Sequence, residues 1–290
     1  MNTHAIDRRA FLQASGLALA SATLTQAASA QSGSPWRKAF MLGVNKGPIL
    51  PHFQKLRAAG FQGVELSSPN QLDRAEVLKA RDETGIIIHG VSGSRHWRDT
   101  LSDPDPKVVE RGLEAIRKEF EDCQAYGGTT VLVVPAVVKP DVSYRDAYAR
   151  SQAAIKTLIP DAEKHGVKIA IEEVWNRFLL SPIEFARYID EFQSPAVGAY
   201  FDVGNVVEFG YPQEWIRELG KRILKVHIKE YKKEKRFGYK LGEGEIDWTA
   251  VARALHDVGY EGWVTAEVGY GSEEELKDVV ARMDKLLGVK

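Results

Sequence analysis

Short apolar runs rich in β-branched residues alternate along the chain with longer segments in which apolar positions recur every three or four residues. The first pattern is typical of buried strands and the second of amphipathic helices, and several helical segments stop at a glycine. Strands are expected at 38–44, 61–66, 86–91 and 129–134 and, in the second half, near Lys168, Val197, Arg222 and Trp263. The helices expected between them cover 50–59, 73–84, 103–126, 143–165, 182–192, 212–219, 248–258 and 273–287.

Eight strand-then-helix units therefore follow one another in the chain. A doubly wound sheet usually stops at about five or six strands, whereas a closed parallel barrel of this kind has eight. We expect an α/β fold, a (β/α)8 TIM barrel, that forms a single catalytic domain over residues 31–290.

Residues 1–30 have the features of an export signal in the expected order. Arg8 and Arg9 precede a mild apolar run at 17–24, and the small residues Ala-Ser-Ala follow at 28–30. This order resembles a twin-arginine signal peptide, which implies the twin-arginine export machinery as a partner and a periplasmic mature protein. The run is too short to span a membrane, and no later stretch reaches about 18 consecutive apolar residues, so we expect no stable membrane span.

Composition narrows the possible partners. The 290-residue chain is 44% apolar with a formal net charge of −1, so it can bury a large core and has no positive excess for binding nucleic acid. Its single cysteine, Cys123, lies in a helical pattern and is expected to be buried among apolar side chains. Neither a disulfide nor a cysteine-based metal site is therefore available. The sequence leaves the oligomeric state open.

Acidic or imidazole side chains stand at the carboxyl ends of four expected strands. One strand ends in Glu172 and Glu173, and the next three end at Asp202, His227 and Glu267. Parallel strands of a barrel bring their carboxyl ends to one face, so these side chains are expected to converge. When the last three point inward, the residues that alternate with them are all apolar, as a face covered by helices requires: Val197, Ala199, Phe201, Leu224, Val226, Ile228, Val264, Ala266 and Val268. On the first of these strands, alternation alone does not choose between the two glutamates.

Three carboxylates and one imidazole are the donors of a site for a hard or borderline divalent cation. The lack of a thiolate favours Mn²⁺ or Mg²⁺, although Zn²⁺ binds such donors more tightly by intrinsic affinity. We expect one divalent ion as cofactor, with Mn²⁺ preferred and Mg²⁺, Co²⁺ or Zn²⁺ as alternatives.

The segments EVWNRF, FDVGN, VHIKEY and TAEV, in this order, resemble the metal-binding strand ends of the xylose isomerase-like TIM-barrel superfamily. The likeness covers residues 38–288 and is greatest to the sugar phosphate isomerase/epimerase group, which includes tagatose-type 3-epimerases and inosose dehydratases. It implies a metal ion held by Glu, Asp, His and Glu, and it selects Glu173 over Glu172 because Val-Trp-Asn-Arg follows Glu173. The other ligands that it implies are Asp202, His227 and Glu267. Three positions after the aspartate, where the epimerases often have a substrate-binding histidine, this chain has Asn205.

The chemistry of such a site is proton removal next to a carbonyl group. A divalent cation bound by the carbonyl and a neighbouring hydroxyl stabilises the enediolate, and a ligand carboxylate acts as the base. Glu173 and Glu267, on opposite walls, are expected to remove a proton from one face and return it to the other. The protein is therefore expected to be an isomerase or epimerase of an unphosphorylated sugar or polyol. Loss of a β-hydroxyl or glycosyl group at the same site would instead give a lyase or dehydratase of a keto-sugar or keto-glycoside, and this alternative stays open.

Weaker candidates for binding the carbohydrate substrate lie in loops at the same face. They follow the third, fifth, sixth and seventh strands and are His96, Trp97, Trp175, Asn176, Asn205 and Lys229. Glu65 and Lys225 are expected to point into the barrel, where an internal ion pair is the simplest interpretation.

Two other classes compete with this interpretation. Relatives of AP endonucleases on the same barrel would need a histidine-rich zinc cluster, and the chain has only seven histidines and no basic excess. A non-catalytic carbohydrate-binding barrel would be expected to have lost a ligand or a base, yet all four ligand positions are occupied by suitable residues.

Overall fold

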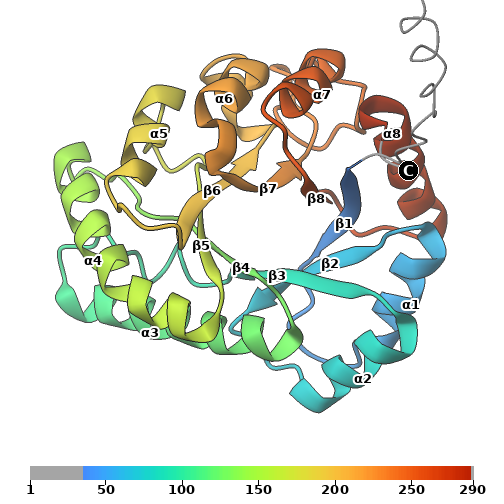
Figure 1. Cartoon of the computed structure of the whole chain (residues 1–290), viewed down its shortest axis with the longest axis horizontal. Coiled ribbons are helices and arrows are strands. Elements are labelled where there is room, and N and C mark those ends of the chain that lie inside the picture. Colours follow the sequence, from blue (N-terminus) through green and yellow to red (C-terminus); the bar gives the residue numbers. More distant parts are fainter. Residues whose placement is uncertain (1–34, 289–290) are drawn as a thin grey trace, which may run out of the picture. The chain divides into compact units, whose positions relative to one another are not determined.

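The computed structural model describes residues 35–288 and confirms the eight-stranded parallel barrel. The strands pair in sequence order and the ring closes where the last strand pairs with the first (Figure 1). The strands are β1 (Trp36–Leu42), β2 (Gly63–Ser68), β3 (Ile87–Gly93), β4 (Thr130–Val133), β5 (Lys168–Glu172), β6 (Val197–Asp202), β7 (Ile223–Ile228) and β8 (Gly262–Ala266).

A helix follows each strand and packs on the outside of the barrel (Figure 1). Hydroxyl or carboxylate side chains cap the starts of six helices, from Asp73, Asp105, Ser143, Ser181, Asp247 and Ser272. Glycines in the left-handed region end several helices, as expected, because this conformation carries no steric penalty for glycine. The helices are α1 (Leu50–Ala59), α2 (Arg74–Thr84), α3 (Pro106–Tyr126), α4 (Tyr144–His165), α5 (Pro182–Asp190), α6 (Pro212–Leu219), α7 (Trp248–Asp257) and α8 (Glu273–Leu287), with short 3-10 turns η1 (Asn205–Glu208) and η2 (Gly220–Arg222).

The apolar core has two layers, as strand alternation predicts. The larger layer lies between strands and helices and contains most of the residues expected there, such as Phe201, Val226 and Val264. A small inner cluster holds Leu132, Val134, Ala170 and Tyr200. Leu224 is an exception to the prediction, since it packs against the inner cluster where the pairing of β6 with β7 shifts by one residue.

The predicted export signal at 1–30 lies outside the described residues. Within residues 35–288, none of the helices combines the length and the apolar character that crossing a membrane requires.

Candidate metal centre

Four side chains meet at the carboxyl end of the barrel. Glu172 ends β5, Asp202 ends β6, His227 lies near the end of β7 and Glu267 follows β8. One potential ligand atom from each lies within 4.8 Å of the others. His227 Nδ1 is 3.1 Å from Glu172 Oε1, 3.4 Å from Glu267 Oε2 and 4.0 Å from Asp202 Oδ2. The imidazole therefore presents one nitrogen to three carboxylates.

Strand register brings these side chains to one level. Asp202 lies beside His227 across the β6–β7 pair, and Glu172 lies beside Tyr200, one inward position below Asp202. The Asp202 carboxylate is held by its own turn, since Oδ1 accepts hydrogen bonds from the backbone N–H groups of Gly204 (2.7 Å) and Asn205 (2.8 Å). Its Oδ2 points to the rest of the group and lies 3.1 Å from Lys229 Nζ.

The β5 member of the group in the structure is Glu172, whereas the sequence pointed to its neighbour Glu173, whose role as a ligand stays a prediction. Inward alternation on this strand runs through Ala170 to Glu172, while Ile169 and Ile171 join the outer core. The strand ends at Glu172, so Glu173 belongs to the following loop, where alternation no longer sets its direction. The Glu173 side chain is nevertheless buried, and neither carboxylate oxygen has a hydrogen-bond partner among the described residues.

Glu65 on β2 supports the imidazole from the other side. Its Oε1 lies 3.2 Å from His227 Nε2, and both side chains are fully buried. A carboxylate behind a histidine fixes the ring and its tautomer, so that the other nitrogen is available as a ligand. The inward direction of Glu65 was predictable, but the predicted ion pair with Lys225 is replaced by this contact with His227.

Burial and close charges perturb the ionisation of the group. Burial opposes the imidazolium, but Glu65 and Glu172 outweigh it and raise the pKa of His227 well above its usual range. Burial and then Asp202 raise the pKa of Glu267, and burial raises that of Glu173. The Lys229 ammonium lies 2.8 Å from Glu267 Oε2 and 3.1 Å from Asp202 Oδ2. Carboxylates thus outnumber cations in this buried region.

This arrangement fits a divalent cation. Three oxygen donors and one nitrogen form the group, and no thiolate is among them. Asp202 Oδ2, like both oxygens of Glu173, is buried and lacks a well-directed hydrogen bond among the described residues. A cation would neutralise an acidic cluster that Lys229 and His227 alone balance only in part.

Trp175, Asn176 and Asn205 hold the loop after β5. Trp175 Nε1 donates to the backbone carbonyl of Asn205 (3.1 Å), and the Asn205 amide donates to the carbonyl of Glu173 (3.0 Å). Asn176 Nδ2 donates to the carbonyl of Ala136 (2.7 Å). These contacts position the segment that carries Glu173, whereas substrate binding by the three residues stays a prediction.

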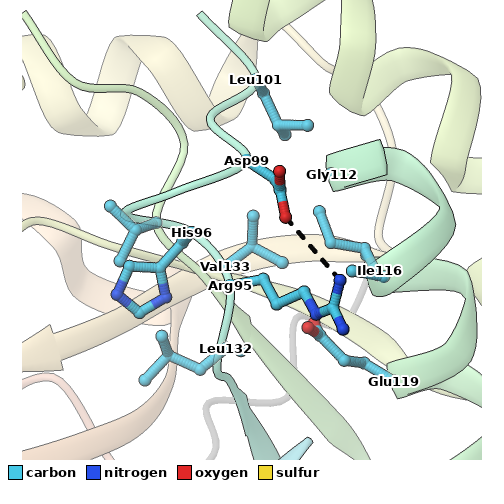
Figure 2. A pocket seen from close by; sticks show the side chains of 12 residues that line it. Arg95, His96, Asp99, Leu101, Gly112, Ile116, Glu119, Leu132 and Val133 are labelled. Carbon is cyan, nitrogen blue, oxygen red and sulfur yellow. Dashed lines mark ion pairs between the residues drawn. The ribbon is translucent and has the colours of Figure 1, made fainter. Parts of the chain in front are cut away.

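His96 and Trp97 lie in the loop after β3. His96 lines a small cavity together with Arg95, Asp99 and Glu119 (Figure 2). The cavity has a volume of about 20 Å³, which is room for about one water molecule. Figure 2 shows the Arg95 guanidinium between the two acids, with an ion pair to Asp99. Burial lowers the pKa of His96 to about 4. Trp97 is 56% exposed. Lys229 and Glu267 line a different, larger cavity that shares no residue with this one.

Sugar 3-epimerases are among the relatives of this chain. It is 29% identical over 220 residues to the L-ribulose 3-epimerase of Methylomonas sp. (strain DH-1), covering 72% of this chain and 74% of that protein. It is 28% identical over 224 residues to the ketose 3-epimerase of Arthrobacter globiformis, covering 74% and 75%. A solved structure of L-ribulose 3-epimerase has the same fold, with a TM-score of 0.77 at 22% identity over 87% of this chain and 95% of that one.

The family assignment rests on a longer match. The family model of the xylose isomerase-like TIM barrel matches residues 53–286, which is more than half of the chain. The closed barrel and the buried Glu-Asp-His-Glu group agree with that match. The chain belongs to the xylose isomerase-like TIM barrel family.

Proposed function

We propose that the protein is a metal-dependent epimerase or isomerase of an unphosphorylated keto-sugar. The observation that carries the proposal is the buried group of three carboxylates and one imidazole at the carboxyl end of the barrel, the face where TIM-barrel enzymes have their active sites. Similarity to sugar 3-epimerases supports the same reaction class.

Glu172, Asp202, His227 and Glu267 would hold the ion, for which Mn²⁺ is the preferred candidate. When bound, such an ion polarises the carbonyl and neighbouring hydroxyl of a keto-sugar and so stabilises the enediolate that proton removal creates.

The proposed proton-transfer groups are Glu173 and Glu267. Glu172 is tied to His227 by a 3.1 Å contact, whereas both oxygens of Glu173 lack a hydrogen bond among the described residues. Lys229 holds Glu267 Oε2 at 2.8 Å and sets the direction of that carboxylate. Burial raises the pKa of both glutamates, which makes each a stronger base than a solvent-exposed carboxylate. Return of the proton to the opposite face gives epimerisation, and return to the neighbouring carbon gives isomerisation.

The adjacent glutamates allow a matched test. Glu172→Gln should lose bound metal, measured by elemental analysis, while Glu173→Gln should keep it and lose about 10²–10⁴-fold in turnover of a ketose panel. The reverse pattern would make Glu173 the ligand. If the metal-loaded wild type converts none of the ketoses, or if both variants match it, the proposed function is wrong. Release of a glycosyl group or of water instead of an epimer would identify the lyase alternative.

We also propose that the protein is exported to the periplasm. The proposal rests on the twin arginines at 8 and 9 and the Ala-Ser-Ala at 28–30, all outside the described residues.

A further inference from the structure

A large cavity opens directly onto the candidate metal centre. Its volume is about 840 Å³, and its inner end is lined by Lys229 and Glu267. It extends past the end of β1 and the loops after β7 and β8 to the side of α8, where Glu275 and Arg282 line it. These two residues are seven positions apart on one helix, which corresponds to about 10 Å. The volume lies near the top of the range of about 300–1,000 Å³ for sites that bind drug-sized ligands. One sugar ring at the metal centre would leave the outer part of this cavity empty.

Aromatic rings line the outer part of the cavity. Tyr239 and Tyr270 come from the two loops on either side of it, whereas Phe237 lies nearer the inner end, with Lys229 Nζ 5.0 Å from the centre of its ring. Tyr270 is firmly placed, since its hydroxyl is 3.0 Å from His52 Nδ1 and its ring packs edge-on against Phe40. Lys55 Nζ lies 4.6 Å from the centre of the Tyr270 ring, and Lys232 Nζ lies 5.6 Å from that of Tyr239. The parts of these rings that line the cavity can pack against the C–H surface of a sugar at little entropic cost.

Each cation that lines the cavity is already paired with a carboxylate of the protein. Lys229 pairs with Glu267 at 2.8 Å, and Lys240 pairs with Asp278 at 2.9 Å. Arg282 pairs with Asp278 at 3.0 Å and with Glu243 at 2.8 Å. A phosphate or carboxylate on the ligand would have to compete with these carboxylates. An uncharged ligand has no such penalty, and the paired side chains still offer donors and acceptors to hydroxyl groups.

We infer that the substrate is a glycoside: a keto-sugar that carries a second, uncharged sugar or aryl ring. The keto-sugar lies at the metal centre, and the second ring lies in the outer cavity between Tyr239 and Tyr270. This inference rests on the proposed function for the inner ring, but the outer binding site is a separate property of the chain.

Two variants test the outer site and leave the metal ligands intact. Tyr239→Ala removes one wall. Gly43→Leu fills the space, because Gly43 lines the cavity and a Cβ added there meets no atom within 4 Å. Tyr211→Ala is the matched control, since this tyrosine is 72% exposed and does not line the cavity.

The probes are D-fructose and the keto-disaccharides lactulose, maltulose and isomaltulose, together with 3-keto-glucose and its phenyl glycoside. Binding is measured by calorimetry and conversion by NMR. At least one two-ring probe should bind more tightly than its one-ring counterpart. Tyr239→Ala and Gly43→Leu should weaken that probe about 3- to 10-fold and change the one-ring sugar less than 2-fold. The control should change neither.

The inference is wrong if one-ring and two-ring probes bind equally well, or if the two variants weaken both kinds of probe equally. In either case, conversion of a ketose would still support the proposed function. Tight two-ring binding without conversion of any probe would contradict the proposed function and leave the outer site standing.

Discussion

Replacing Glu65 by Gln removes a charge from behind the metal centre without removing a ligand. Glu65 is fully buried, with Oε1 at 3.2 Å from His227 Nε2. The amide that replaces it has nearly the same shape and can still accept one hydrogen bond. The amide carries no negative charge to favour the protonated Nε2. The imidazole should therefore be less well oriented, and its Nδ1 should be a weaker base.

The expected cost follows from the position of Glu65. Loss of a carboxylate behind a metal-binding histidine typically costs about 10- to 100-fold in metal affinity. This equals about 1.4–2.7 kcal/mol of binding free energy. Because metal stabilises only the folded state, the rise in melting temperature on adding Mn²⁺ should shrink by about 3–8 °C.

The assay is a Mn²⁺ titration by calorimetry together with thermal melts with and without EDTA. Glu119→Gln is the control, because Glu119 is also a buried acid with an unpartnered Oε2, but it lines the small cavity of His96. Burial raises its pKa well above the usual range, so the amide resembles its protonated form. Equal Mn²⁺ affinity in wild type and Glu65→Gln would refute the supporting role of Glu65, and an equal loss in Glu119→Gln would show a general effect on the fold.

Three further predictions concern other parts of the chain. Burial lowers the pKa of His96 to about 4 in the folded protein, against 6.5 in the unfolded chain. As the pH falls, the unfolded state therefore binds the proton first. Through this group, the free energy of unfolding of the wild type should fall by about 2–3 kcal/mol between pH 7 and pH 4.5. His96→Gln should lack that part of the slope in urea melts, and an unchanged slope would contradict the assignment. Burial raises the pKa of the Cys123 thiol to about 12, so iodoacetamide at pH 8 should modify it only after unfolding; rapid labelling of native protein would count against its burial. Changing both Arg8 and Arg9 to Lys should block export in a fractionation assay, whereas normal export would exclude the twin-arginine route.

The barrel was predictable because its signals are local. Strand alternation, helix caps and terminal glycines each act within a few residues, and the expected boundaries of α1, α6 and α8 match the structure. Asp202, His227 and Glu267 were predictable for the same reason, since each stands at an inward position at or near the end of an alternating strand.

The remaining part of the site depends on where regular alternation stops. Glu172 and Glu173 are neighbours at the end of β5, and the order of the following residues pointed to the second glutamate. In the structure the last residue of the strand is Glu172, and it keeps the inward direction set by Ala170. The contact of Glu65 with His227 joins β2 to β7 across the barrel. Strand alternation predicts that a side chain points inward, but it does not predict which residue of a distant strand that side chain contacts.

Exchange of the substrate proton with solvent tests the proposed chemistry most directly. A keto-sugar that the protein converts is incubated in D₂O with the Mn²⁺-loaded wild type, the EDTA-treated protein and Glu267→Gln, and deuterium is located by NMR. The proposal predicts deuterium on the carbon next to the carbonyl in substrate and product, and little exchange after metal removal. Glu267→Gln should exchange this proton in one of the two epimers only, through Glu173, and should form little product. Product that contains no solvent deuterium, or exchange that continues unchanged without metal, would contradict proton transfer at this centre.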